Sequence, residues 1–295
     1  MKITRFVFSG AESYGVLIDD GILDLSKLSK MMEISVPQSM EELVSLGLEG
    51  QNLLEGLISN LNKAEMRKIM IKRNEVILKA PIASPPKIIC LGLNYRDHAE
   101  EARAKTPDEP VIFMKPHTSI VGPDEPVVKP SFVKQLDYEV ELAIVIGKRG
   151  RNIPLPKAKE HIFGYTAFND ISARDIQFKD GQWTRGKSFD TFAPIGPCIT
   201  TTDQIGDPTN LHVCTRVNSK VRQNSSTRNM VFNVYEIVNH LSRVMTLEPR
   251  DIIATGTPGG VAVFMKTKPR FLMPGDTVEV EIEKIGTLRN PIIEE

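Results

Sequence analysis

The segment LDYEVELAIVIG, residues 136–147, places two glutamates directly before an apolar run. A run of this kind predicts a strand that is buried on both faces. Because side chains alternate across a strand, Glu139 and Glu141 are expected to share one face, ~7 Å apart at ~3.3 Å per residue. One cation bridges that span when each glutamate provides one oxygen. The opposite face is expected to carry Val140, Leu142, Ile144 and Ile146.

A bare pair of glutamates on a strand more often marks an exposed face with solvated charges. Beside a buried run, however, two unpaired carboxylates are costly unless a metal or another cation compensates them. Asp170, at the end of GYTAFND, offers a third oxygen ligand. An all-carboxylate set favours a hard cation, Mg²⁺ with Mn²⁺ or Ca²⁺ as alternatives, over zinc.

The chain divides at a proline-rich stretch, APIASPPK. Residues 1–28 show short strand patterns with turn signals, and residues 39–71 show the spacing of amphipathic helices. Beyond the prolines, strand patterns prevail, interrupted by a helix near Tyr95 and another at 234–245. We therefore expect a small N-terminal α+β module at residues 1–75, a linker at 76–86 and a β-dominated catalytic domain at 87–295. The fold class is α+β.

Charge and composition narrow the function classes. The chain has 37 basic and 37 acidic residues and no basic stripe, so neither a nucleic acid nor an anionic membrane is expected as a partner. No apolar stretch approaches the ~18 residues of a membrane span. Three widely spaced cysteines fit neither a disulfide framework nor a zinc knuckle. Phosphate-binding glycine motifs are missing from the sequence, which disfavours a nucleotide enzyme. These features predict a soluble, cytoplasmic protein that acts on a small molecule.

The segment GLNYRDHAEEA predicts a short helix. Asn94 is a good N-cap and Asp97 stands where a capping-box acid would, so the helix is expected to begin at Tyr95. His98 and Glu101 then lie three residues apart on one face, where the carboxylate can orient the imidazole as a catalytic base. The alternative is a partly exposed histidine beside one of two adjacent glutamates.

Two further segments carry candidate ligand-binding residues. The long polar segment at 169–197 contains Lys187, which can neutralise charge on a reacting oxygen, and Gln177, which can hydrogen-bond a substrate. In ATGTPGGV a turn exposes backbone amides, and Thr257 can bind a carboxylate. A plain surface role for the first two residues, and a simple tight turn for the third, remain open.

Taken in order, GLNYRDHAEEA, FMKPHTSIVGP, DYEVELAIVIGK, GYTAFNDISARDIQ, QWTRGKSFDTFAPIGP and DIIATGTPGGV closely resemble the fumarylacetoacetate hydrolase family. The resemblance runs from about residue 80 to the end. Residues 1 to about 75 resemble the N-terminal module of bacterial two-part members and of animal domain-containing proteins of the family. The usual TGTP-P-GV turn is TGTPGGV here, which leaves Thr257 in place.

The resemblance implies a mixed β-sandwich or β-roll catalytic domain, usually in a homodimer, with Mg²⁺ or Mn²⁺ as cofactor. The implied metal ligands are Glu139, Glu141 and Asp170. In the family, the histidine and glutamate of a short lid helix form the catalytic couple, and a lysine contacts the bound substrate. The implied catalytic residues here are His98, Glu101 and Lys187. The implied substrate-binding residues are Gln177, Thr257 and Lys115.

The family's chemistry implies a metal-dependent enzyme for 2-oxo acids or 1,3-dicarbonyl acids. Hydrolytic carbon–carbon cleavage of an acylpyruvate or 2,4-dioxo acid is our first expectation. Oxaloacetate decarboxylation and keto–enol tautomerisation or isomerisation are alternatives, because one metal and one acid/base couple serve all of these reactions. A dicarboxylate sensor is the non-enzyme alternative, although a sensor does not need His98 and Glu101.

Overall fold

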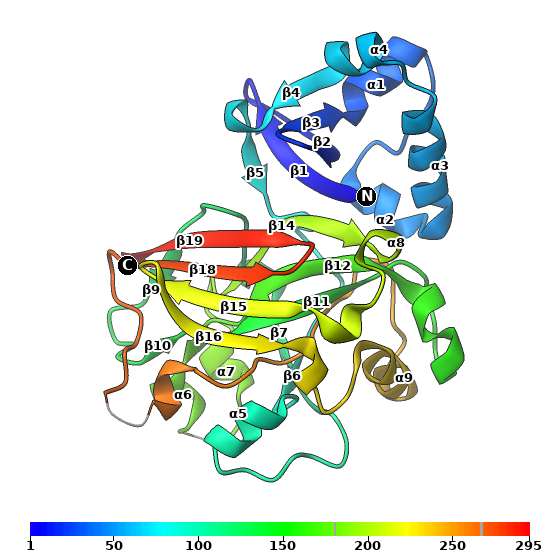
Figure 1. Ribbon diagram of the computed structural model, residues 1–295. Helices are drawn as coiled ribbons and strands as arrows, with labels where there is room; N and C mark the ends of the chain where they lie inside the picture. Colours follow the sequence, from blue (N-terminus) through cyan, green and yellow to red (C-terminus); the bar gives the residue numbers. More distant parts are fainter. Residues whose placement is uncertain (180, 266–267) are drawn as a thin grey trace.

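The computed structural model describes residues 1–179, 181–265 and 268–295 (Figure 1). It is a mixed α+β, strand-rich fold, as the sequence predicted. An N-terminal unit, blue to cyan in Figure 1, stands above a larger body that holds both sheet layers.

The N-terminal unit contains the short strands predicted in residues 1–28 and the helices predicted in residues 39–71. It also contains a helix over Leu25–Met32 and a strand over Met70–Lys72 that the sequence did not predict. Its strands are β1 (Lys2–Phe8), β2 (Ala11–Ile18), β3 (Gly21–Asp24) and β4 (Met70–Lys72). Its helices are α1 (Leu25–Met32), α2 (Met40–Ser45), α3 (Leu48–Ser59) and α4 (Lys63–Ile69). Helix α4 begins with a capping box between Asn62 and Glu65, which satisfies the first free N–H groups.

One sheet runs through both the N-terminal unit and the body. Strand β1 pairs antiparallel with β14 (Ala193–Thr201), and β5 (Ile77–Lys79) pairs with the other end of β1. Residues 1–75 are thus tied to the body by main-chain hydrogen bonds. Strand β5 lies within residues 76–86, where we expected a linker, and the module boundary stays a prediction.

The body is built of two layers of strands. The large sheet continues through β12 (Ile162–Asn169), β11 (Val140–Ile146), β17 (Ile252–Ala254), β6 (Ile88–Gly92) and β7 (Val111–Lys115). The second sheet has the order β16 (Lys220–Ser226), β15 (His212–Val217), β18 (Thr277–Ile282), β19 (Gly286–Glu294) and β9 (Val127–Lys129). Shorter strands are β8 (Ile120–Val121), β10 (Leu136–Asp137) and β13 (Ser172–Ala173).

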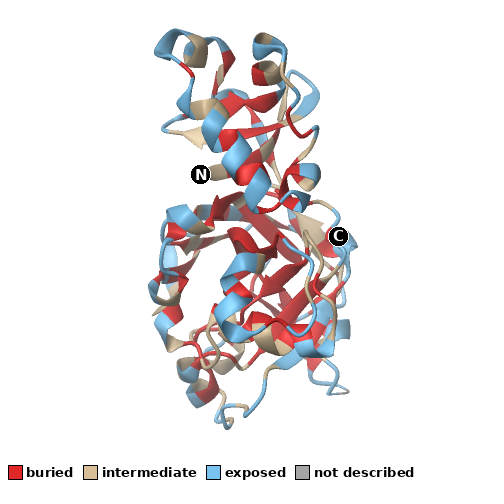
Figure 2. Cartoon of the chain, turned by 90° about the vertical axis from the view of Figure 1, so that its right-hand side faces the viewer, coloured by how far each residue is buried: buried red, intermediate tan, exposed pale blue. Residues whose placement is uncertain are grey.

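Strand β11 lies at the centre of the core and is buried along its whole length. Figure 2 shows the strands inside the body mostly in red, the colour of buried residues. The predicted apolar face, Val140, Leu142, Ile144 and Ile146, packs in one cluster with the buried side of helix α9 (Val234–Val244). Ala143 and Val145, on the opposite face, pack in a second cluster that includes Ile3 of β1. Each fully buried aliphatic side chain here stabilises the fold by about 1.5–3 kcal/mol. The prediction of a strand buried on both faces is therefore confirmed.

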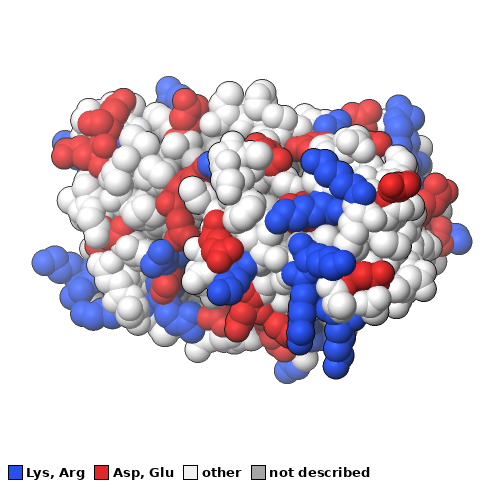
Figure 3. All heavy atoms as spheres, turned by 90° about the horizontal axis from the view of Figure 1, so that it is seen from above, with Lys and Arg blue, Asp and Glu red and all other residues white. Residues whose placement is uncertain are grey.

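Short helices join the strands of the body. They are α5 (Arg96–Glu101), α6 (Arg174–Gln177), α7 (Thr184–Lys187) and α8 (Thr202–Ile205). In the described ranges no helix is long and apolar enough to cross a membrane. Basic and acidic side chains are interspersed on the face seen from above (Figure 3).

Candidate active site

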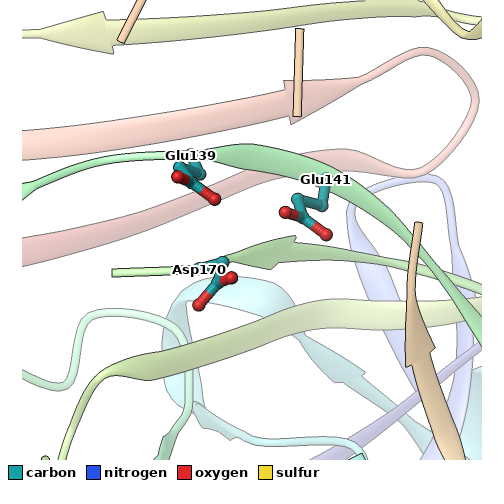
Figure 4. Close-up of side chains that lie close together, drawn as sticks. All are labelled: Glu139, Glu141 and Asp170. Atoms are coloured by element: carbon teal, nitrogen blue, oxygen red, sulfur yellow. The ribbon is translucent and has the colours of Figure 1, made fainter. Parts of the chain in front are cut away.

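Three buried carboxylates meet where β11 and β12 lie side by side. Glu139 directly precedes β11, Glu141 is its second residue, and Asp170 directly follows β12. The antiparallel pairing of Val140 with Asn169 brings these strand ends together. One oxygen of each carboxylate lies within 4.8 Å of the others, and Figure 4 shows the three groups converging. Residues that are distant in the sequence thus form one acidic cluster, as the metal-site prediction requires.

Two lysines neutralise part of this cluster. Lys187 Nζ lies 2.8 Å from Glu139 Oε2 and 2.6 Å from Asp170 Oδ2. Lys115 Nζ lies 2.6 Å from Asp170 Oδ1 and donates a second bond to the carbonyl of Ile171 at 3.2 Å. Both lysines are buried. Asp170 is therefore held between two ammonium groups, one from β7 and one from α7.

Arg174 is a site residue that the sequence analysis missed. Its Nη2 lies 2.6 Å from Glu139 Oε1, its Nε lies 2.9 Å from Asp137 Oδ2, and its Nη1 donates to Gln177 Oε1 at 2.9 Å. The carboxylate of Asp137 also accepts the main-chain N–H groups of residues 262 and 263. Arg174 lies in the same polar segment as Gln177, so the sequence could have suggested it as a site residue. Its partners Asp137 and Glu139 are far away in the sequence, and no local pattern indicates them.

The surroundings shift the pKa values of Glu139 and Glu141 in opposite directions. Burial acts to raise the pKa of Glu139, but the nearby Lys187 and Arg174 outweigh it and lower that pKa to about 2. Burial raises the pKa of Glu141 well above its usual range, and the charges of Asp170 and Glu139 raise it further. Burial likewise opposes the charge on Lys187, but the carboxylates of Asp170 and Glu139 raise its pKa above the usual value.

Glu141 provides the observation that tests whether a metal fits. Its Oε2 accepts the N–H of Gly256 at 2.8 Å, while its Oε1 is buried and has no hydrogen-bond partner among the described residues. An unpaired buried carboxylate oxygen beside two further carboxylates is the donor set of a hard divalent cation. Glu139, Glu141 and Asp170 therefore fit a divalent metal.

Helix α5 brings His98 into the pocket that Glu139 also lines, with Glu101 beside it. His98 Nδ1 lies 3.9 Å from Glu101 Oε2, and that oxygen also accepts the N–H of Gly260 at 2.8 Å. The ring of His98 lies 5.7 Å from the ring of Phe264. The two predicted catalytic side chains are thus adjacent, and Glu101 ties α5 to the glycine turn.

The predicted start of this helix was wrong. Asn94 does not cap it: its Nδ2 donates to the carbonyls of Phe232 and Thr255, and its Oδ1 accepts the N–H of Phe232. The helix begins at Arg96, after Tyr95 as N-cap, and no side chain caps it. Asp97 instead accepts the N–H of His98 and the hydroxyl of Ser225. The side chains of Asn94 and Asp97 therefore form hydrogen bonds with distant parts of the chain and do not form a capping box.

The other predicted binding residues lie at the same pocket. Thr257 Oγ1 donates to the carbonyl of Val140 at 3.0 Å and accepts from Gln223 Nε2 at 2.8 Å. Gln177 Oε1 accepts from Arg174 Nη1 at 2.9 Å. The pocket has a cavity volume of about 60 Å³. Its polar lining is His98, Glu139, Arg174, Gln177, Lys187 and Thr257, and its apolar lining is Leu91, Gly92, Leu93, Phe113, Phe178, Trp183 and Phe264.

Comparison with known proteins adds relatives that are named as enzymes. A protein-family model described as fumarylacetoacetate (FAA) hydrolase C-terminal matches residues 87–293. The mitochondrial oxaloacetate tautomerase FAHD2A of Bos taurus is 42% identical over 276 residues, which cover 92% of this chain and 84% of that protein.

Solved structures extend the likeness to the N-terminal unit. Fumarylacetoacetate hydrolase (EaFAH) from psychrophilic Exiguobacterium antarcticum is 38% identical, with a TM-score of 0.84 and coverage of 100% of both chains. Maleylpyruvate hydrolase from Sphingobium sp. SYK-6, in complex with manganese(II) and pyruvate, is 31% identical, with a TM-score of 0.79 and coverage of 100% of this chain and 99% of that one.

Proposed function

This chain belongs to the fumarylacetoacetate hydrolase family, and from that premise we propose that it is a divalent-metal-dependent enzyme that interconverts the enol and keto forms of oxaloacetate. The observation that carries the proposal is that His98, with Glu101 Oε2 3.9 Å from its Nδ1, lines the same pocket as Glu139 of the acidic cluster. Tautomerisation requires only that a proton moves between an oxygen and the adjacent carbon, which one oriented acid/base couple can perform. Likeness to the bovine tautomerase over 92% of the chain supports this reaction over the others.

Glu139, Glu141 and Asp170 would hold the metal, with Mg²⁺ as the proposed ion. Mn²⁺, the ion in the Sphingobium hydrolase, and Ca²⁺ are the alternatives. When bound, a divalent cation polarises a 2-oxo group and stabilises negative charge on its oxygen.

The protein's own residues supply the remaining chemistry. Lys187 and Arg174 line the pocket with positive charge that attracts a carboxylate and stabilises an enolate oxygen. Gln177 offers its amide N–H, and Thr257 can turn its hydroxyl from the main chain to a substrate carboxylate. His98 then takes the proton of the enol hydroxyl and returns a proton to the adjacent carbon. Glu101 orients the imidazole, and the reaction consumes no water.

A second candidate is hydrolytic carbon–carbon cleavage of an acylpyruvate, our first expectation from the sequence. It is supported by the likeness to the maleylpyruvate hydrolase. In that reaction His98 would deprotonate a water instead of the enol. Decarboxylation of oxaloacetate and a binding-only sensor remain further alternatives, and a homodimer in the cytoplasm stays a prediction. The bovine relative is named as mitochondrial.

The deciding experiment measures three reactions with one enzyme preparation. Ultraviolet absorbance measures enol decay of oxaloacetate, and NMR detects pyruvate formed from oxaloacetate or pyruvate plus acetate formed from acetylpyruvate. We expect faster enol–keto exchange that EDTA abolishes and Mg²⁺ restores. Acetylpyruvate cleavage without faster exchange would move the assignment to the hydrolase, and net pyruvate from oxaloacetate to the decarboxylase. Metal-dependent binding without turnover of either compound would indicate the sensor.

A further inference from the structure

One wall of the pocket is aromatic and closes over a glycine. Trp183, half-buried at the start of α7, lies edge-on to Phe113 with ring centroids 5.7 Å apart and planes at 71°. A Cβ added to Gly92 would lie 1.9 Å from the indole ring of Trp183. The indole therefore rests directly on the backbone of Gly92, and residue 92 has no room for a side chain.

The aromatic wall adjoins the charged part of the site. Phe113 contacts Trp183 on one side, and Lys187 Nζ lies 4.9 Å from its ring centroid on the other. Trp183 and Lys187 are four residues apart, at the two ends of the same short helix segment. Lys187, Phe113 and Trp183 all line the pocket, so a ligand whose charged end meets Lys187 shares the pocket with both aromatic rings.

We propose that Trp183, seated on Gly92 and Phe113, sets the maximum length of the 2-oxo acid that the pocket accepts. This inference rests on the proposed function, because it takes a 2-oxo acid as the ligand. Removing the indole opens apolar space at the end of the pocket, and each additional methylene buried there strengthens binding about fourfold.

The test compares wild type with Trp183→Ala by Mg²⁺-dependent thermal shift and calorimetry, which need no turnover. The probes are pyruvate, 2-oxobutanoate, 2-oxopentanoate and 2-oxohexanoate. We expect wild-type affinity to fall at the longer acids and Trp183→Ala affinity to rise by roughly fifteenfold over the last two methylenes. Trp183→Phe, the conservative variant, should be intermediate and serves if the alanine variant fails to fold. Phe132→Ala, which removes an exposed aromatic ring that does not line the pocket, should leave the length preference unchanged.

A double-mutant cycle tests the contact itself. Gly92→Ala should lower the melting temperature of the wild type but have a smaller effect in the Trp183→Ala background, because the colliding ring is gone. Equal length preference in wild type and both Trp183 variants would overturn the inference while the proposed function stands. If no 2-oxo acid binds any of the proteins, this inference fails, while the proposed function is decided separately by the enol–keto exchange of oxaloacetate.

Discussion

Arg174 Nη2 lies 2.6 Å from Oε1 of Glu139, so this glutamate is ion-paired by the protein itself. Glu141, two residues away on the same strand face, receives the N–H of Gly256 and, in the part of the chain that the structure describes, no further hydrogen bond. Buried cations thus compensate one end of the acidic cluster and leave the other end for a metal.

Glu141→Gln should therefore abolish metal binding without destabilising the metal-free protein. The change replaces a buried carboxyl group whose Oε1 has no hydrogen-bond partner among the described residues, and it keeps the shape of the side chain. For the wild type, metal at 100 times its Kd should add about 2.7 kcal/mol to the free energy of unfolding. Melting curves with EDTA and with Mg²⁺ or Mn²⁺ measure both effects. Glu279→Gln in β18, the matched control, should keep the full metal-induced shift.

His98→Ala should lower turnover by about 10²- to 10⁴-fold, because it removes the proposed acid/base group. The metal-induced rise in melting temperature should persist, since the carboxylates are untouched. Glu101→Gln should have a smaller effect, because the amide oxygen can still accept the N–H of Gly260. Steady-state rates beside melting curves separate the two roles. Wild-type turnover in His98→Ala would remove His98 from the mechanism.

Asp137→Asn should be strongly destabilising, although this residue lies behind the pocket. Its carboxylate is fully buried, pairs with Arg174 and accepts main-chain N–H groups, including that of Ala262. Removing one partner of a buried ion pair costs about 3–5 kcal/mol. Asp124→Asn is the matched control, because its pair with Arg289 is more than half exposed, and such pairs contribute about 0–1 kcal/mol. Urea unfolding of both variants measures the difference, and equal losses would contradict the structural role of Asp137.

Removing residues 1–86 should destabilise the body. Strand β14 would lose its partner β1, the cluster around Val145 would lose Ile3, and the carbonyl of Phe163 would lose the buried bond from Gln51 Nε2 at 2.7 Å. An unpaired strand edge beside exposed apolar surface favours aggregation. Light scattering and melting curves of a chain of residues 87–295 test this. A monodisperse product with the wild-type melting temperature would instead show that the body is stable without residues 1–86.

The local sequence determined which faces of the strands and helices are buried, because these faces follow from the spacing of apolar residues. The alternation in β11 predicted which side chains enter the core, and the spacing in α9 predicted its buried stripe, because strand and helix geometry place residues two, three or four apart on a common face. The motif order likewise identified the family.

Only the tertiary structure decided the pairings between residues far apart in the chain. It assigned Arg174 to Glu139, placed Asp170 between Lys115 and Lys187, and moved the amide of Asn94 from a helix cap to a strand end and a loop. It also seated Trp183 on Gly92, a contact across 91 positions that no local pattern contains. Such contacts depend on strand order and on the cost of leaving buried polar groups unpaired, which are properties of the whole fold.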